Sequence, residues 1–471
     1  MPANIPENFK RHVHSTGAEI DHGPADVELA NTSAAVQKFF LDNPSIKYVR
    51  LQWTDMAGML RARIATKAWA LRLVAQNKPV YIQSPMTSAM QLGGIMYETL
   101  QLGSDSLWPQ WETLRGIGYV DGHAAVSCHI KDCSEKLEHG YELDPRSALK
   151  RKVAEVRERA GLEFLVGYEI EFIILEIKNP QTGEEQPLET GSGIWTTDTY
   201  RNKSAPVLGE ILDILNDAGV EVRQYHSEGA NGMFEISTEP LPPLQAVDEL
   251  YFAQEVIKGV CYKHGLRGTL HVQPTEGGPH VGCHTHISIV GCDSEKVAGS
   301  FTQGVLNSMP GLIAIGMPSW VSYVRASFLG GWVMWANDFK GCPFRRVNPM
   351  NDFHWELRWP DFLANHYLFL TALLGVAAAA VEQEVELEMK PRTKNTLTKI
   401  ETEEREETGI KRALPSTMRQ GLDALEQDEI IKKEMGSHLF ERFLQNKNAE
   451  EEAFKNIPTE AERRARIGTA F

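Results

Sequence analysis

The sequence predicts an α+β protein built from a small unit followed by a larger one, and three observations lead to this. Short stretches with the alternation of strands are separated by longer stretches with the apolar spacing of helices. The length of 471 residues suggests two to four domains at roughly 100–200 residues each. The composition changes near residue 140, where Asp144 can cap a helix with Pro145 in its first turn. We therefore expect an arm at residues 1–30, a small α+β unit at residues 31–140 and a larger unit at residues 141–471.

The small unit begins with a predicted helix at residues 33–41 and a strand at residues 48–53, where VRLQW alternates. Residues 79–108 are weakly patterned, and short strands around residues 118–129 close the unit. In the larger unit, predicted strands cover residues 164–175, 232–237, 281–289 and 353–359. Predicted helices cover residues 203–218, 244–264, 298–316, 363–389 and 419–445. The charged segment at residues 390–410 is predicted to be a surface loop.

Composition excludes several classes of protein. Lys and Arg number 48 against 63 Asp and Glu, a net charge of −15, which disfavours binding to nucleic acid. Six cysteines without a CxxC pair indicate buried, reduced thiols rather than a disulfide framework or a zinc ribbon. The first 30 residues lack the pattern of a signal or transit peptide. The longest apolar run, Leu368 to Val381, is shorter than a membrane span needs. We expect a cytoplasmic protein that does not bind membranes.

Two carboxylates share one face of the strand LVGYEIEFIIL. Side chains alternate along a strand, so Glu169 and Glu171 point the same way, and the other face is apolar or Tyr. Burying two neighbouring carboxylates requires a compensating cation. That cation is a metal ion or a Lys or Arg partner, and this strand alone leaves both open.

Three more segments carry acids or histidines. In GCHTHIS one face holds His284, His286 and Ser288, and in FHWELRW one face holds His354, Glu356 and Arg358. In HSEGANGMFEIS, Glu228 sits in a Gly-rich turn and Glu235 follows on a strand. Each alone has an ordinary structural explanation, but four such strands favour a shared cavity. Five Glu and one His suit Mg²⁺ or Mn²⁺, whereas zinc would require more His or Cys.

Arginines near these segments point to phosphoryl transfer, because guanidinium groups and metal ions together neutralise phosphate oxygens. They are Arg325, Arg345, Arg346 and Arg358. No Walker A loop is present: the GxxxxG at Gly277–Gly282 continues into Cys-His. No GxGxxG opens a helix, and no HExxH occurs. P-loop ATPases, Rossmann dehydrogenases and zinc proteases are therefore disfavoured.

The motifs together resemble the glutamine synthetase family, from about residue 45 to the C-terminus. The resembling segments are VGYEIEF, HSEGANGMFEIS, GCHTHIS, SYVR, WELRWPD with ANHY, and LPSTMRQGLDALEQD. The resemblance implies an N-terminal β-grasp domain and a catalytic domain whose antiparallel sheet forms a funnel flanked by helices. It also implies a homo-oligomer of stacked rings, a decamer or dodecamer, with sites between subunits. The family chemistry uses ATP to convert a carboxylate into an acyl phosphate, from which an amine displaces phosphate.

The resemblance also implies a role for each matching residue. One metal ion would be held by Glu171, Glu228 and Glu235, and a second by Glu169, His284 and Glu356, with two or three Mg²⁺ or Mn²⁺ ions per site. Arg345 would face the ATP phosphates, while His286 and Ser288 would border the nucleotide. Arg325 and Arg358 would bind the substrate carboxylate and the phosphoryl group, and Lys340 replaces a family Arg.

The departures from the family pattern concern the substrates. The D-G-S-S loop that helps bind ammonium is replaced by VYIQSPMTS, and the flap ASFLGGWVMWAN contains no acid. Ammonium needs a negative site that takes its proton. The flap instead offers Phe328, Trp332 and Trp335, which favours a bulkier amine. A family Asn-Gly that contacts the amino end of glutamate aligns with Pro279 and His280.

Three readings remain open. The first is an ATP-dependent ligase that joins the γ-carboxylate of glutamate to an organic amine. The second keeps this chemistry but changes the carboxylate donor, because of Pro279 and His280. The third is a non-catalytic ring-forming scaffold or sensor, and the survival of all six implied metal ligands argues against it. An ordinary glutamine synthetase is disfavoured by the missing ammonium site.

Overall fold

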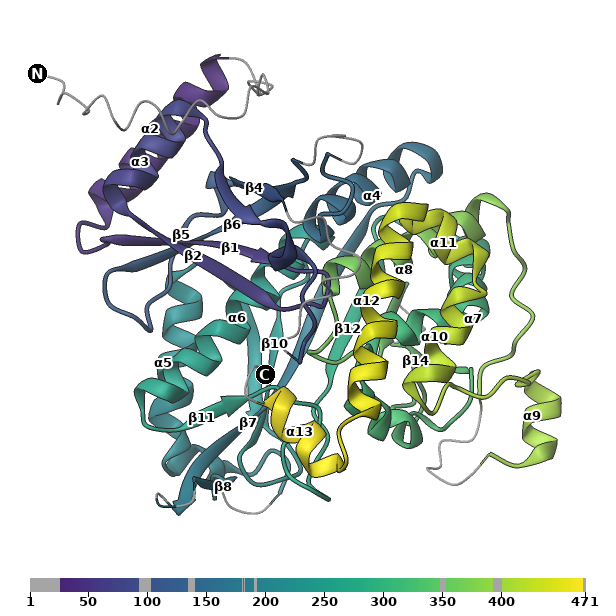
Figure 1. Cartoon of the computed structure of the whole chain (residues 1–471). Helices are drawn as coiled ribbons and strands as arrows, with labels where there is room; N and C mark the ends of the chain where they lie inside the picture. Colours follow the sequence, from purple (N-terminus) through teal and green to yellow (C-terminus); the bar gives the residue numbers. More distant parts are fainter. Residues whose placement is uncertain are drawn as a thin grey trace, which may run out of the picture.

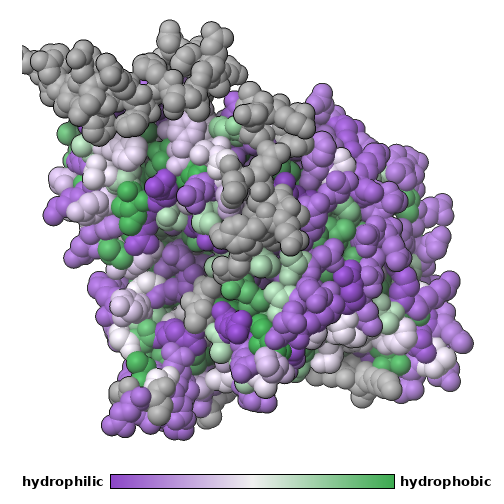
Figure 2. Space-filling view, viewed as in Figure 1, coloured by the Kyte–Doolittle hydropathy of each residue, from purple (hydrophilic) through white to green (hydrophobic). Residues whose placement is uncertain are grey.

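The computed structural model describes residues 26–92, 103–133, 140–179, 181, 183–189, 193–347, 353–392 and 400–468. The predicted α+β class is confirmed, with two sheets and the helices packed around them (Figure 1). The arm predicted at residues 1–30 lies mostly outside the described residues. Among the described residues, no helix is long and apolar enough to span a membrane. Hydrophilic residues cover most of the face in Figure 2, and hydrophobic residues form only scattered patches there.

The first sheet has six strands and belongs to the N-terminal part of the chain. Its order is β2 (Leu60–Thr66), β1 (Tyr48–Thr54), β6 (His123–Lys131), β4 (Ser104–Pro109) and β3 (Val80–Gln83), and β5 (Arg115–Gly116) pairs with β6. Helices α2 (Asp26–Asp42) and α3 (Lys67–Gln76) accompany this sheet. Val49 and Leu51 of β1 are buried in its core, as the alternation predicted. The predicted helix at residues 33–41 begins earlier, at Asp26, and β3 and β4 occupy the stretch that looked weakly patterned.

The second sheet has nine strands and carries the predicted acids. Its order is β13 (Trp335–Asn337), β14 (Phe344–Arg346), β15 (His354–Leu357), β12 (Cys283–Ile289), β7 (Phe164–Asn179), β10 (Met233–Thr238) and β9 (Val222–Ser227). Two further strands, β8 (Glu184–Pro187) and β11 (Arg267–Thr269), pair with β7. All pairs except β13 with β14 are antiparallel.

Helices pack against the second sheet and against one another. They are α4 (Pro145–Ala160), α5 (Ser204–Asp217), α6 (Pro243–Lys263), α7 (Glu295–Gly316) and α8 (His366–Glu382). Helix α8 is buried along almost its whole length, so the apolar run predicted to be a core helix is one. Asp144 caps α4 by accepting the N–H of Ser147, and Pro145 occupies the first turn as predicted. The large hydrophobic core around the second sheet also includes residues from the N-terminal part of the chain, namely Met56, Ile117 and Ala125.

Two predicted segments need correction. The helix expected at residues 419–445 is three helices, α10 (Met418–Glu426), α11 (Glu429–Met435) and α12 (Ser437–Lys455). Asp428 starts α11 by accepting two backbone N–H groups, and Gly436, at φ +84°, ends it. Helix α9 (Thr402–Thr408) lies in the predicted surface loop, of which residues 393–399 are outside the described part. A last helix, α13, covers Glu460–Gly468. All six cysteines are free, as predicted, but only four are buried, because Cys133 and Cys292 are partly exposed.

Candidate functional site

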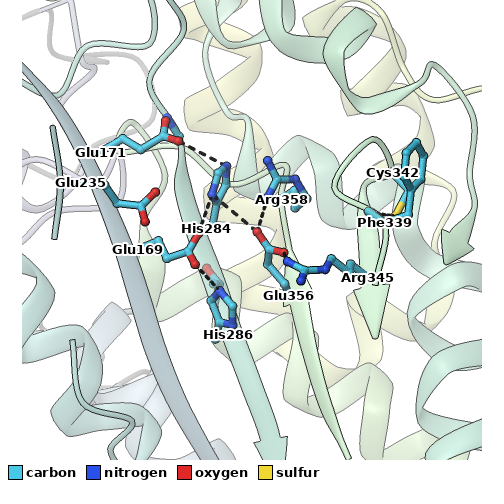
Figure 3. A network of polar contacts seen from close by, with 12 residues as sticks. Glu169, Glu171, Glu235, His284, His286, Phe339, Cys342, Arg345, Glu356 and Arg358 are labelled. Atoms are coloured by element: carbon cyan, nitrogen blue, oxygen red, sulfur yellow. Dashed lines mark hydrogen bonds and ion pairs between the residues drawn. The ribbon is translucent and has the colours of Figure 1, made fainter. Parts of the chain in front are cut away.

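Strand register brings the predicted acids and histidines together on one face of the second sheet. Across β7 and β12, Glu169 lies opposite His284, and across β7 and β10, Glu171 lies opposite Glu235. On β15, Glu356 lies opposite His286 of β12. In Figure 3 these side chains point toward one another from neighbouring strands. Four segments distant in sequence thus build one cluster.

The inner part of the cluster is centred on Glu169. Its carboxylate oxygens lie 3.1 Å from His284 Nδ1 and 3.1 Å from His286 Nε2. His284 Nδ1 is also 3.6 Å from an oxygen of Glu356, whose side chain is fully buried. Glu169, Glu235 and His284 offer ligand atoms within 4.8 Å of one another, as do Glu169, His286 and Glu356. These donor sets are dominated by carboxylate oxygen and fit a hard divalent cation such as Mg²⁺ or Mn²⁺.

The outer part contains a residue that the sequence analysis did not single out, His226. Its Nε2 lies 3.2 Å from Glu235 and its Nδ1 lies 3.4 Å from Glu228, and the three residues form a third potential metal-binding group. Glu171 is in none of these groups, but it lies 3.9 Å from His284 Nε2 and accepts the N–H of Gly282. The signal for His226 was its spacing, because it stands two residues before Glu228 in HSEG.

Charge repulsion shapes the ionisation of this cluster. Burial, then repulsion from Glu169, Glu171 and Glu228, raises the pKa of Glu235 to about 9. Burial opposes ionisation of Glu169 too, but hydrogen bonds from His284 and His286 outweigh it and hold the pKa of Glu169 well below its usual range. The cluster holds more carboxylate than its protein partners neutralise, which is the condition under which a bound cation stabilises a site.

Guanidinium groups border the cluster on the side of Glu356. Arg345 contacts one oxygen of Glu356 at 2.7 Å, and Arg358 forms an ion pair with the other. Burial opposes ionisation of Glu356, but Arg358 is the largest influence that lowers its pKa below the usual value. Arg345 also contacts Asp338. Figure 3 shows both arginines meeting Glu356.

Arg325 is buried and held by backbone carbonyls. Its Nη1 donates to the carbonyls of Trp359 and Pro360, and its Nη2 donates to that of Arg358, each at 2.9 Å. A side chain at position 282 would place its Cβ 2.5 Å from Nη2 of Arg325 and 2.8 Å from Nε2 of His284. Glycine is therefore required where the cluster meets this guanidinium.

The other predicted residues lie at different distances from the cluster. Ser288 is opposite His354 on the same strand face as His286, and His286 Nδ1 lies 2.8 Å from His354 Nε2. Lys340 is exposed, and its charge lowers the pKa of Glu228 and Glu235, although burial raises both more strongly. Arg346 is not part of the cluster, because it pairs with Glu295 at 2.8–2.9 Å.

The expected aromatic flap surface is smaller than the sequence suggested. Trp335 is buried and donates its indole N–H to the carbonyl of Met389. Trp332 lies under the guanidinium of Arg405, at 4.3 Å from ring centroid to Cζ. Only Phe328 of the three is strongly exposed, at 69%, and its ring meets His280 edge-on at 4.5 Å.

Residues 142–466 match the family model described as the glutamine synthetase catalytic domain. The chain belongs to the glutamine synthetase family. This confirms the resemblance drawn from the motifs. The family uses ATP and divalent metal ions, and its ligases form C–N bonds.

Curated relatives share about a quarter to a third of the sequence. Protein fluG of Emericella nidulans is 30% identical over 458 residues, which are 95% of this chain but 51% of fluG, so the chain spans about half of that protein. The glutamine synthetase of Methanococcus maripaludis is 26% identical over 445 residues, covering 90% of this chain and 96% of the relative. The Staphylococcus aureus enzyme is 26% identical over 448 residues, with the same coverage.

Solved structures with the same fold include GmaS and a glutamine synthase homologue. GmaS without ligand superposes with a TM-score of 0.74 at 22% identity, covering 90% of this chain and 97% of GmaS. The GmaS/ADP complex gives 0.75 at 21% identity, covering 92% and 98%. The structure described as a novel glutamine synthase homologue gives 0.76 at 19% identity, covering 90% and 99%.

Proposed function

We propose that this glutamine synthetase family member is an ATP-dependent ligase that joins the γ-carboxylate of glutamate to an organic amine. The supporting observation is the cluster around Glu169, in which carboxylates and imidazoles lie within metal-binding reach beside Arg345 and Arg358. Divalent metal with guanidinium is the combination that phosphoryl transfer to a carboxylate requires. The likeness to the GmaS/ADP complex supports ATP as the phosphoryl donor.

We propose the following roles for the residues of the site. By the family resemblance, Glu169, His284 and Glu356 would hold one divalent ion, and Glu171, Glu228 and Glu235 would hold another. His226 would lie beside the second ion, since it forms one group with Glu228 and Glu235. When bound, the ions neutralise phosphate charge during transfer. Arg345 and Arg358 would contact phosphate oxygens, and Arg325 would bind the carboxylate of the donor. The acyl phosphate would then react with the amine nitrogen, and phosphate would leave.

The choice of an organic amine rests on the missing negative site. The flap between Arg325 and Asp338 carries no acid, and Phe328 is its strongly exposed large apolar side chain. Ammonium gains nothing from an apolar contact, whereas a carbon substituent does. We therefore propose that ammonia is a poor substrate.

The alternative donor is favoured by His280. Its Nε2 lies 3.0 Å from Gln273 Nε2, an amide nitrogen that also donates to the carbonyl of Gly278. His280 Nε2 is thus an acceptor and Nδ1 carries the proton, and Nδ1 is buried without a hydrogen-bond partner among the described residues. An N–H donor attracts a carbonyl or carboxylate and repels an ammonium group. A dicarboxylate without an amino group is therefore the second candidate donor.

Mass spectrometry of incubations with Mg²⁺ or Mn²⁺, ATP, one carboxylate and one amine tests both candidates. Donors should include glutamate and unaminated dicarboxylates, and amines should include ammonia and mono-, di- and aromatic amines. A γ-glutamyl amide of an organic amine is the expected product, and Glu235→Gln serves as the inactive control. Glutamine as the main product would contradict the amine proposal. A correctly assembled protein that binds ATP but forms no amide would instead be a scaffold.

We also propose that the chain forms a homo-oligomer of ten or twelve subunits in stacked rings, and that it works in the cytoplasm on small molecules. Strand β2 is an edge of its sheet, and its Ile64 is 58% exposed, which leaves an edge available for pairing. Light scattering after size exclusion would test this against the chain mass of 52.8 kDa. A monomer at micromolar concentration would contradict the ring.

A further inference from the structure

Trp195 has a backbone conformation that a bulky residue rarely adopts. Its φ is +61°, in the left-handed region. The segment is fixed to β9 there, because the N–H of Trp195 donates to the carbonyl of Ser227 at 3.3 Å and to its Oγ at 3.2 Å. The indole is nevertheless 63% exposed, so core packing does not account for a tryptophan at this position.

The exposed indole lies at the outer edge of the acid cluster. Its ring meets that of His226 at 75°, with 5.6 Å between centroids. His226 in turn contacts Glu228 and Glu235. The preceding Ile194 is 53% exposed and lies beside Gly229, where an added Cβ would be 3.4 Å from Ile194. An apolar pair, Ile194 and Trp195, therefore stands next to the half-buried carboxylate of Glu228.

We propose that Trp195 is a specificity-determining residue whose indole face receives the organic group of the amine substrate. This inference rests on the ligase function proposed above. An indole face attracts both apolar groups and organic cations. Ammonia has no carbon substituent to place on the ring. Trp195 therefore raises the preference for an organic amine without taking part in bond formation.

Trp195→Asn is the decisive variant, because Asn tolerates the left-handed conformation and keeps the backbone while removing the ring. Trp195→Phe keeps an aromatic face. Tyr262→Asn is the matched control, since Tyr262 is 83% exposed at the end of α6. Thermal melting verifies that each variant is folded, and steady-state kinetics compare the best organic amine with hydroxylamine, a small nucleophile.

For Trp195→Asn we expect kcat/KM for the organic amine to fall about tenfold, mainly through KM, while hydroxylamine and ATP constants stay within about twofold. Trp195→Phe and Tyr262→Asn should stay close to the wild type. If the wild type is active and Trp195→Asn loses the same activity toward both nucleophiles, or none toward either, Trp195 does not determine specificity. The proposed ligase function would be unaffected by that result. A wild type that forms no amide with any nucleophile would overturn both.

Discussion

Glu235 is a buried carboxylate with three further carboxylates around it. Burial is the largest influence that raises its pKa, followed by repulsion from Glu169, Glu171 and Glu228. Within the described part of the chain, its close partner is His226, at 3.2 Å. In the metal-free protein this residue is therefore a source of strain, and in the metal-bound protein it is a ligand.

Replacing Glu235 by Gln should separate these two effects. Without metal, the variant should melt at a temperature equal to or above that of the wild type, because the cost of burying this carboxyl group among other carboxylates is removed. Added Mn²⁺ should raise the melting temperature of the wild type but much less that of the variant, and amide formation should fall at least about 100-fold. Differential scanning fluorimetry with and without Mn²⁺ measures the first two effects.

Glu239→Gln is the control, because Glu239 forms an exposed ion pair with Arg223 away from the cluster. It should keep the Mn²⁺ response of the wild type. An undiminished Mn²⁺ shift in Glu235→Gln would remove Glu235 from the ligand set.

Alternation along strands was sufficient to predict which side chains share the cluster face. Glu169, His284 and Glu356 meet because the register of β7, β12 and β15 preserves the parity visible in the sequence. The alternation could not predict that the side chains of Trp332 and Trp335 are covered by other parts of the chain. Their partners Arg405 and Met389 lie more than 50 residues further along the chain. A local sequence pattern therefore cannot predict these contacts.

At the scale of elements, α8 illustrates how burial fixes the state of a titratable group. His366 is its first residue and is fully buried, with its ring among Tyr168, Tyr251 and Phe369. Its Nε2 contacts the carbonyl of Asp361 at 3.2 Å. Burial lowers the pKa of His366 to about 3, so the imidazole is neutral in the folded protein.

His366 should make the protein less stable in mild acid. Its pKa is about 6.5 in the unfolded chain and about 3 in the folded one. A lowered folded pKa gives a contribution that is complete above pH 6.5 and is lost as pH falls toward 3, by about 1.4 kcal/mol per pH unit. His366→Phe removes this loss, although it also removes the contact with Asp361.

Urea unfolding of wild type and His366→Phe at pH 7, 6 and 5 tests this. The stability of the variant relative to the wild type should rise as pH falls, whatever its value at pH 7. Two curves that decline in parallel would show that His366 is not buried neutral. Other acid-sensitive groups are common to both proteins, so they cancel in the difference.

Element boundaries were predictable where a capping residue marked them. Asp144 and Pro145 indicated the start of α4. The single helix predicted at residues 419–445 is three helices, because only residues 427–428 and Gly436 separate α10, α11 and α12. Asp428 and Gly436 interrupt a pattern whose apolar spacing continues across them. Strands β3 and β4 were missed because they are short and alternate for only a few residues.

At the scale of the whole molecule, helix α12 joins the C-terminal part of the chain to residues 88–91. Asn446 donates to the carbonyl of Ser88 at 3.0 Å, and Glu450 accepts the N–H of Gln91 at 2.7 Å. The Gln91 side chain donates in turn to the carbonyls of Ala57 and Leu363. Hydrogen bonds thus connect the segment after β3 with the unit that carries the metal cluster, which no local sequence pattern could indicate.

Lys447 and Glu450 place a fully buried ion pair within this connection. Their charged atoms are 2.7 Å apart, and the exposed fractions of their side chains are 1% and 0%. Removing one member of a buried pair leaves the other charge unpaired and costs about 3–5 kcal/mol, whereas replacing both by apolar residues is often close to neutral. Glu450 also accepts a backbone N–H, so its loss carries an additional cost.

Glu450→Ala should therefore lower the free energy of unfolding by about 3–5 kcal/mol. The double variant Lys447→Met with Glu450→Met should lose less than this single one, because no charge is left buried. Urea unfolding at one protein concentration measures both, and Lys455→Met is the control, since Lys455 is half-exposed on the same helix. If Glu450→Ala lost no more than Lys455→Met, the pair would be hydrated in solution and α12 would not fasten residues 88–91. If the double variant were the less stable, the pair itself would be the main stabilising contact between these parts of the chain.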